Sequence, residues 1–210
     1  NLSGVAEARS VSVRNGAVVL GGGGGGTVRV SGRVTTRAPR ISAEAVASSL
    51  RPQQRPTGGR IDITGAQIAL AGAEIDASGD GGGGLIRIGG DFAGAGMFAR
   101  ADTVTVDAST EIRVDALGQG DGGRAVIWSD LATEFSGRIS ARGGAHGGNG
   151  GFVEVSSARA LSYSGLTDLR APAGDFGTLL LDPDDILVPG TISEADVETA
   201  LSLGNLTLDT

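Results

Sequence analysis

The sequence contains no cysteine, no lysine and very few aromatic residues. The absence of cysteine excludes disulfide bonds, thiol catalysis and metal sites built on cysteine ligands. The absence of lysine excludes a Walker A loop, so the glycine-rich runs of the chain do not form that phosphate site. Phe, Tyr and Trp make up only 3% of the residues. A core without such large side chains is typical of short repeated strands separated by tight corners.

Long apolar runs and a positive net charge are also missing. No stretch approaches the ~20 apolar residues of a membrane-spanning helix, so membrane insertion is not expected. The net charge of −7 at pH 7 opposes binding to nucleic acid, whose phosphates need a basic surface. The first residues form neither the charged nor the apolar part of a signal peptide. We therefore expect an internal fragment of a longer protein.

Glycine is abundant, with 38 residues, and much of it recurs in one motif. A glycine pair precedes alternating apolar residues in GGTVRV (25–30), GGRIDI (58–63), GGLIRI (83–88), GGRAVI (122–127), GGFVEV (150–155) and, in degenerate form, FGTLLL (176–181). A second motif separates these copies, as GAEIDASG (72–79), TEIRVDALG (110–118), SGRISARGG (136–144) and SGLTDLRAP (164–172). Each unit therefore consists of a strand, a short link, a second strand and a glycine corner.

Apolar residues alternate with period 2 in both motifs, as in Ile86 and Ile88, which indicates strands with one buried face. Alternation alone suits an antiparallel sandwich equally well. The repeated order of the motifs and the scarcity of hairpin signals favour a single-stranded parallel β-helix, or β-solenoid, with equivalent side chains stacked in columns. The fold class is thus all-β, with one β-helix segment over residues 1–210 and short helical excursions.

Two segments lengthen the repeat. Residues 37–57 are expected to leave the coil as a loop that holds a short Ala-rich helix, with Ser42 as its cap. Residues 89–101 are expected to form a second loop excursion, followed by an extra strand at 102–108.

The C-terminal region contains a third departure from the repeat. Ser193 followed three residues later by Asp196 is a capping-box pattern, and it predicts a short helix over 193–203 in a C-terminal insertion. A strand at 205–210 then indicates a chain cut in mid-solenoid.

The ordered series of motifs resembles a known family. The phrases that carry the resemblance are GGTVRVSG, VIWSDLATEFSGRISARGG, GGNGGFVEVSS, SGLTDLRAPAGDFGTLLLDPDDI and ISEADVETALSLGNLTL. They resemble the exoproteins of two-partner secretion, the filamentous-haemagglutinin-like adhesins of Gram-negative bacteria. The resemblance covers essentially the whole chain and is strongest over residues 122–188.

This resemblance implies a right-handed parallel β-helix that is exported through a dedicated outer-membrane transporter. It also implies a secreted or cell-surface location and attachment to a glycan or protein on host or neighbouring cells, with the segment as a monomer. Two features depart from the family. Its amino-terminal secretion module, with an Asn-Pro-Asn signature, is absent here, so transporter recognition is expected to lie in that module. Thr167 occupies a position where the repeat has an aliphatic residue, which suggests a locally weaker coil.

Three clustered carboxylates, Asp182, Asp184 and Asp185, raise the question of a cation site. Pro183 and the following apolar run break the EF-hand pattern. The Asp-Pro-Asp-Asp sequence is also a natural turn, in which Pro fixes φ and Asp side chains bond nearby amides. The turn is the favoured interpretation, and no metal or cofactor is expected.

Other candidate chemistry is weaker. Asp80, Asp121 and Asp175 each precede a glycine corner, but the strict repeat of calcium-binding β-rolls is missing. His146, the only histidine, lies among glycines and is interpreted as an exposed turn residue rather than a catalytic base. The strand acids, which are Asp62, Asp76, Asp107 and Asp115, are expected to face outwards without an acid-and-base signature. No catalytic residue is assigned.

One basic segment stands out on this acidic chain. Residues 33–60 contain six arginines against a single acid, Glu44. Such a segment could contact sulfated glycans or anionic surfaces, although a solvated loop is the simpler reading. Trp128 could stack on a sugar ring, or be partly buried against a loop. The candidate ligand contacts are Arg37, Arg40, Arg51, Arg55 and Trp128.

Three functions remain open at this stage. The leading hypothesis is a non-enzymatic, structural and adhesive β-helical stalk segment of a large secreted bacterial surface exoprotein. The second is a carbohydrate-active β-helix enzyme, and the third is a pure spacer with binding elsewhere in the parent protein.

Overall fold

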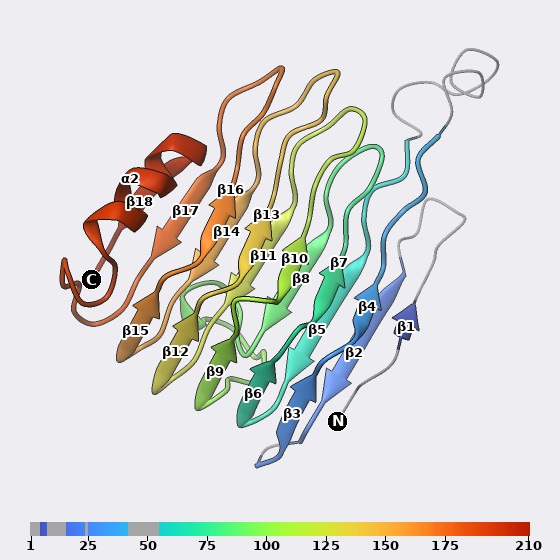
Figure 1. Cartoon of the computed structure of the whole chain (residues 1–210). Coiled ribbons are helices and arrows are strands. Elements are labelled where there is room, and N and C mark those ends of the chain that lie inside the picture. The colour runs from blue at the N-terminus through green and yellow to red at the C-terminus, as the bar shows by residue number, and fades with distance from the viewer. Residues whose placement is uncertain (1–4, 8–15, 24, 42–54) are drawn as a thin grey trace.

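The computed structural model shown in Figure 1 describes residues 5–7, 16–23, 25–41 and 55–210. The helix expected after Ser42 and the candidate contact Arg51 lie outside these residues. The described elements are β1 (Val5–Glu7), β2 (Ala17–Gly21), β3 (Thr27–Val30), β4 (Arg33–Thr35), β5 (Arg60–Thr64), β6 (Gln67–Leu70), β7 (Glu74–Asp76), β8 (Leu85–Ile88), the 3-10 turn η2 (Phe92–Gly94), β9 (Thr103–Val106), β10 (Glu111–Arg113), β11 (Arg124–Ile127), β12 (Ala132–Phe135), β13 (Arg138–Ser140), β14 (Phe152–Val155), β15 (Ala160–Tyr163), β16 (Leu166–Asp168), β17 (Thr178–Leu181), α2 (Glu194–Leu203) and β18 (Asn205–Leu208).

The strands form three parallel sheets around one core (Figure 1). Sheet A has the order β15-β12-β9-β6-β3, sheet B the order β1-β4-β7-β10-β13-β16, and sheet C the order β18-β17-β14-β11-β8-β5-β2. From β1 to β17, consecutive strands along the chain belong to different sheets, so each full coil supplies one strand to each sheet. The chain is therefore a right-handed parallel β-helix, which confirms the fold class expected from the repeat.

Each coil contains three strands, where the sequence motifs revealed two. The strand at 102–108 is not an extra element, because β9 pairs in register with β6 on one side and β12 on the other. It is the regular sheet A strand of its coil. GGTVRV contains the sheet A strand β3, whereas the other copies of the glycine-pair motif contain sheet C strands. The remaining sheet A strands lack a preceding glycine pair and share no common sequence, as QIAL and ATEF illustrate, so the motifs did not reveal them.

The core consists of aliphatic columns that run through the coils. On sheet C, Ile63, Ile88, Ile127 and Val155 are Cα partners from coil to coil and are fully buried. Burying such a side chain contributes roughly 1.5–3 kcal/mol relative to leaving it exposed. Because every coil repeats the same inward positions, small and branched side chains fill most of the tube, and Phe135 and Tyr163 add aromatic rings near its C-terminal end.

Thr167 faces this core beside Ile139 and is 2% exposed. Its hydroxyl group forms a 2.8 Å hydrogen bond with the hydroxyl group of Tyr163, whose ring stacks on Phe135 at 5.5 Å between centroids. The buried polar atom therefore has a partner, which removes the main cost of placing a threonine in an aliphatic column.

The glycine pairs before the sheet C strands permit close stacking of successive coils. A Cβ atom built on Gly123 would lie 2.2 Å from the carbonyl oxygen of Gly84, and one on Gly151 would lie 2.1 Å from that of Gly123. Real Cβ atoms do not approach backbone this closely, so the repeated glycine is a packing requirement at this corner.

Residues 89–101 leave the coil after β8 and pass over the outer face of sheet C, as the green loop beside β8 and β11 in Figure 1. The Ala101 N–H group donates a 2.7 Å hydrogen bond to the carbonyl group of Gly89, which closes the base of this loop. The loop contains the short turn η2, and its tip lies against β11 and β14. We call residues 89–101 the flap.

The C-terminal end of the coil stack is covered by helix α2. Ser193 caps this helix, its hydroxyl oxygen accepting a hydrogen bond from the Asp196 N–H group, and Ala200 is buried against the last coil. The chain then returns to sheet C as β18, which pairs in parallel with β17. Within the described ranges, no helix is long and apolar enough to cross a membrane.

Candidate functional site

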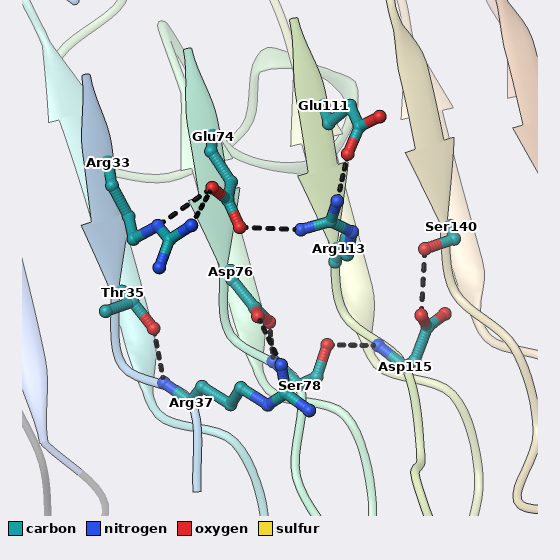
Figure 2. A network of polar contacts seen from close by, with 10 residues as sticks. All are labelled: Arg33, Thr35, Arg37, Glu74, Asp76, Ser78, Glu111, Arg113, Asp115 and Ser140. Atoms are coloured by element: carbon teal, nitrogen blue, oxygen red, sulfur yellow. Dashed lines mark hydrogen bonds and ion pairs between the residues drawn. The ribbon is translucent and has the colours of Figure 1, made fainter.

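The outer face of sheet B carries a network of charged side chains (Figure 2). Inward residues of its strands, such as Ile75, Ile112 and Ile139, are buried in the core. Their sequence neighbours must therefore point outwards, because side chains alternate along a strand. In-register stacking then brings outward residues of adjacent coils side by side, where oppositely charged groups can pair.

One part of the network is centred on Glu74 of β7. Its carboxylate accepts hydrogen bonds from Arg33 on one side and Arg113 on the other, each at 2.8 Å, and Arg113 also pairs with Glu111. Burial opposes ionisation of Glu74, but the hydrogen bonds and charges of the two arginines outweigh it and lower its pKa. These pairs are partly exposed, so each stabilises the fold only modestly.

A second part of the network continues along the same face. The Asp76 carboxylate lies 3.5 Å from Arg37 and accepts a 2.8 Å hydrogen bond from the Ser78 N–H group. On the next coils, the Ser140 hydroxyl group donates to Asp115 at 2.9 Å. Burial raises the pKa of Asp115, although the Arg142 N–H group and the Ser140 hydroxyl group act in the opposite direction.

The network ends on β16 at Asp168. Its carboxylate lies 2.8 Å from Arg170 and 3.8 Å from Arg142. Burial opposes ionisation here too, but the contacts with Arg170 outweigh it and lower the pKa of Asp168.

Among the residues whose side chains are described, this face carries more arginines than carboxylates although the chain is acidic. This set contains seven arginines and five carboxylates, a net charge of +2, whereas the whole chain has a net charge of −7. The arginines are Arg33, Arg37, Arg40, Arg113, Arg138, Arg142 and Arg170, and the carboxylates are Glu74, Asp76, Glu111, Asp115 and Asp168. We call this set the sheet B charged face.

Two hollows open on the sheet B charged face. One of about 140 Å³ is lined by Arg40, Asp115, Arg142 and Pro172 among others. The other, of about 250 Å³, is lined by Glu111, Arg113, Arg138, Ser140 and Asp168 together with apolar neighbours. Within the described part of the chain, no carboxylate lies in ion-pair range of Arg138, so this guanidinium group is available to a ligand. Both hollows are smaller than the ~300–1,000 Å³ typical of sites for drug-sized molecules.

The candidate arginines have different environments. Arg37 and Arg40 are exposed on the sheet B charged face, and Arg40 donates a 3.1 Å hydrogen bond to the Leu117 carbonyl group. The Arg55 side chain is only 14% exposed and lies 2.5 Å from Asp80, so it braces a glycine corner within the chain.

Trp128 does not present its ring to solvent. It is 7% exposed and lies beneath the flap, where Cβ atoms built on Gly90 or Gly94 would come within 2.6 Å of its side chain. Its Nε1–H group points to Asp130 at 3.4 Å. The partial-burial reading of Trp128 agrees with this position.

The candidate acids have local roles. Asp182 follows β17, and burial together with Asp209 and Asp184 raises its pKa. In the described ranges, no three metal-ligating side chains converge. Asp107 accepts hydrogen bonds from Gly72, Ser109 and Thr110 and thereby organises a turn. His146 is exposed at a glycine corner.

Asp62 faces outwards, as expected, but it is not open to solvent. It is 4% exposed, because the Arg87 guanidinium group covers it at 2.9 Å. Sequence reasoning also missed Glu154, which faces outwards on β14 yet is fully buried under the flap. Gly90 and Gly94, which allow the flap to approach the sheet, were the only signal of this cover in the sequence.

Comparison with solved structures gives a match over most of the chain. The chain superimposes on the crystal structure of the HMW1 secretion domain from Haemophilus influenzae with a TM-score of 0.62 and 27% sequence identity. The match covers 83% of this chain and 42% of that one, so the chain spans less than half the length of that domain. No protein-family profile matches the chain, and no curated protein does. The chain is therefore similar to a bacterial secretion domain in fold and, to a lesser degree, in sequence.

Proposed function

We propose that this chain is a β-helical segment of a large secreted bacterial exoprotein exported by two-partner secretion. The observation that carries the proposal is the similarity to the HMW1 secretion domain, which extends over 83% of the chain. The cysteine-free sequence suits passage through a narrow transporter. The mature segment is a monomer at the bacterial surface or in the medium.

The role proposed for the segment is structural and adhesive, in the manner of filamentous-haemagglutinin-like adhesins. The coil stack supplies a stiff stalk, and the sheet B charged face supplies the contact surface. Its partner is a glycan or protein on a host or neighbouring cell. Arg138 in the 250 Å³ hollow and Arg142 at the border of the smaller hollow are the residues best placed to contact an anionic group.

A matched pair of variants tests the adhesive role. The double variant Arg138→Gln and Arg142→Gln removes two charges from the sheet B charged face. The control Arg29→Gln and Arg159→Gln removes two exposed arginines elsewhere. Binding to cells and to a glycan array should fall at least about tenfold in the first variant and little in the second, as one lost ion pair to a ligand predicts.

Other outcomes separate the alternatives. An equal loss of binding in both variants would show that net charge alone drives attachment, and no binding by the parent chain would support a spacer. The proposal assigns no catalytic residue. Reproducible cleavage of a polysaccharide, lost when Asp76 and Asp115 are replaced by Asn, would establish the carbohydrate-active alternative instead.

A second candidate function concerns the transporter. The resemblance places its recognition in a module outside this chain, but the matched structure is itself a secretion domain. The described coils could therefore contribute to the transporter contact. The test compares export of a fused reporter by the cognate outer-membrane transporter with and without residues 55–181. Export that falls without these residues would show that the coils contribute to the transporter contact, and unchanged export would show that they do not.

A further inference from the structure

The flap and the strand beneath it form an arrangement that neither stalk nor adhesion requires. Both ends of the flap are fixed to the coil by arginine–aspartate pairs. At its start, Arg87 lies 2.5 Å from Asp91 and 2.9 Å from Asp62. At its end, Arg100 lies 3.1 Å from Asp130. These pairs join both ends of the flap to the coil, and we call them the two anchors.

The tip of the flap is held differently. The Ala93 N–H group donates to both carboxylate oxygens of Glu154, at 3.0 and 3.3 Å. The Phe92 ring packs edge-on against Phe152, and the Arg124 guanidinium group lies 4.7 Å from the Phe92 ring centroid. Ala93 itself has φ of 51°, a left-handed conformation that an alanine adopts only under constraint. The docked tip thus depends on one buried carboxylate and a strained residue.

Glu154 is fully buried but has no cation in direct contact among the described residues. The charged groups that act on it are Arg124 on β11 and Asp182 after β17. The flap residue Asp91 is paired with Arg87. Burial and the Asp182 charge oppose its ionisation, while the Ala93 N–H group and the Arg124 charge favour it. The balance raises the pKa of Glu154 to about 7.

We propose that the flap is a hinged cover over the outer face of sheet C, held closed by Glu154 in its neutral form and released when that carboxylate ionises. Release leaves the two anchors and the Gly89–Ala101 base intact, so only the tip moves. The carboxylate then reaches water, and Trp128, Phe152 and Arg124 become accessible. The exposed surface combines aromatic rings with a guanidinium group that has no ion pair in the described ranges.

The direction of the pH effect follows from the raised pKa. Docking is fully favourable below the ordinary Glu pKa of 4.5 and weakens as pH rises through about 7. A shift from 4.5 to about 7 changes the equilibrium between docked and released tip by about 300-fold between acid and alkaline conditions.

Trp128 is the only tryptophan and lies directly beneath the flap, so its fluorescence reports the opening. The experiment measures the quenching of Trp128 fluorescence by acrylamide, an uncharged quencher, in the whole chain from below pH 4.5 to above about pH 7. Quenching in the parent should rise with pH, with a midpoint between 4.5 and about 7, and should level off above about 7. In Glu154→Gln it should stay low throughout, because the glutamine oxygen still accepts from Ala93 and never ionises.

Three controls keep the test specific. His146→Asn removes the only histidine, and Glu134→Gln removes an exposed carboxylate on β12, so both should retain the pH profile of the parent. Gly94→Ala, at φ of 60° and over the indole ring, should raise quenching at every pH. A parent whose quenching does not change with pH would overturn the proposal. So would a profile that survives in Glu154→Gln or disappears in His146→Asn.

Discussion

Glu154 should make the folded chain less stable as the solution becomes more alkaline, and replacing it with glutamine should remove that loss. The side chain is fully buried and its pKa is raised to about 7 from 4.5. A group with a raised pKa in the folded state stabilises it fully below the unfolded pKa, and this contribution disappears as pH rises through the folded pKa. The shift corresponds to about 3 kcal/mol at 1.36 kcal/mol per pKa unit.

The measurement is the free energy of unfolding in urea for the parent and for Glu154→Gln, once below pH 4.5 and once above about pH 7. Taking the difference between the two proteins at each pH cancels the titration of every other group. The advantage of the variant should grow by up to about 3 kcal/mol from acid to alkaline conditions, or less if the flap opens before the coils unfold. An advantage that stays constant within about 0.5 kcal/mol, below the usual effect of a neutral surface change, would refute the reasoning.

Three further predictions concern the coil. Ile127→Ala, in a fully buried column, should lower the free energy of unfolding by about 2–5 kcal/mol in urea titrations, whereas Glu134→Ala on the exposed face should change it by less than about 0.5 kcal/mol. Gly123→Ala should prevent folding or lower the melting temperature by more than ten degrees, because its Cβ atom would meet the Gly84 carbonyl group, and circular dichroism will show this as lost β-structure. The double variant Asp184→Asn and Asp185→Asn should melt at the same temperature with and without calcium, as the parent should; a calcium-dependent shift present only in the parent would identify a cation site.

Much of the fold could be predicted because the coil obliges the sequence to repeat. Inward positions such as Ile86 and Ile88 must alternate with outward ones, and each sheet C strand needs a glycine where neighbouring backbones nearly touch. The third strand of each coil was harder to find. Sheet A has no such glycine requirement, so β9 was mistaken for an addition rather than a regular member.

The surface could be predicted only where nothing covers it. Arg37 and Arg40 lie on an open face, and their exposure follows from local sequence. Trp128 and Glu154 also occupy outward positions, yet the flap from a different coil buries both. Alternation indicates which way a side chain points, but it carries no information about a loop that folds back over the sheet. The raised pKa of Glu154 arises from that cover and was therefore not visible in the sequence.

The central claim is that the chain is an in-register parallel β-helix, and disulfide trapping tests it directly because the sequence has no native cysteine. Thr105 on β9 and Glu134 on β12 are Cα partners at outward-facing positions of sheet A. Glu134 is in turn the Cα partner of Ser162 on β15, one coil further on. Neighbouring parallel strands lie ~4.8 Å apart, within the Cα separation of a disulfide, and two coils span about twice that distance. The account predicts that the Thr105→Cys and Glu134→Cys double variant oxidises to an intramolecular disulfide while folded, detected by mass spectrometry, and that Thr105→Cys with Ser162→Cys does not. Efficient cross-linking of the second pair, or none of the first, would contradict it.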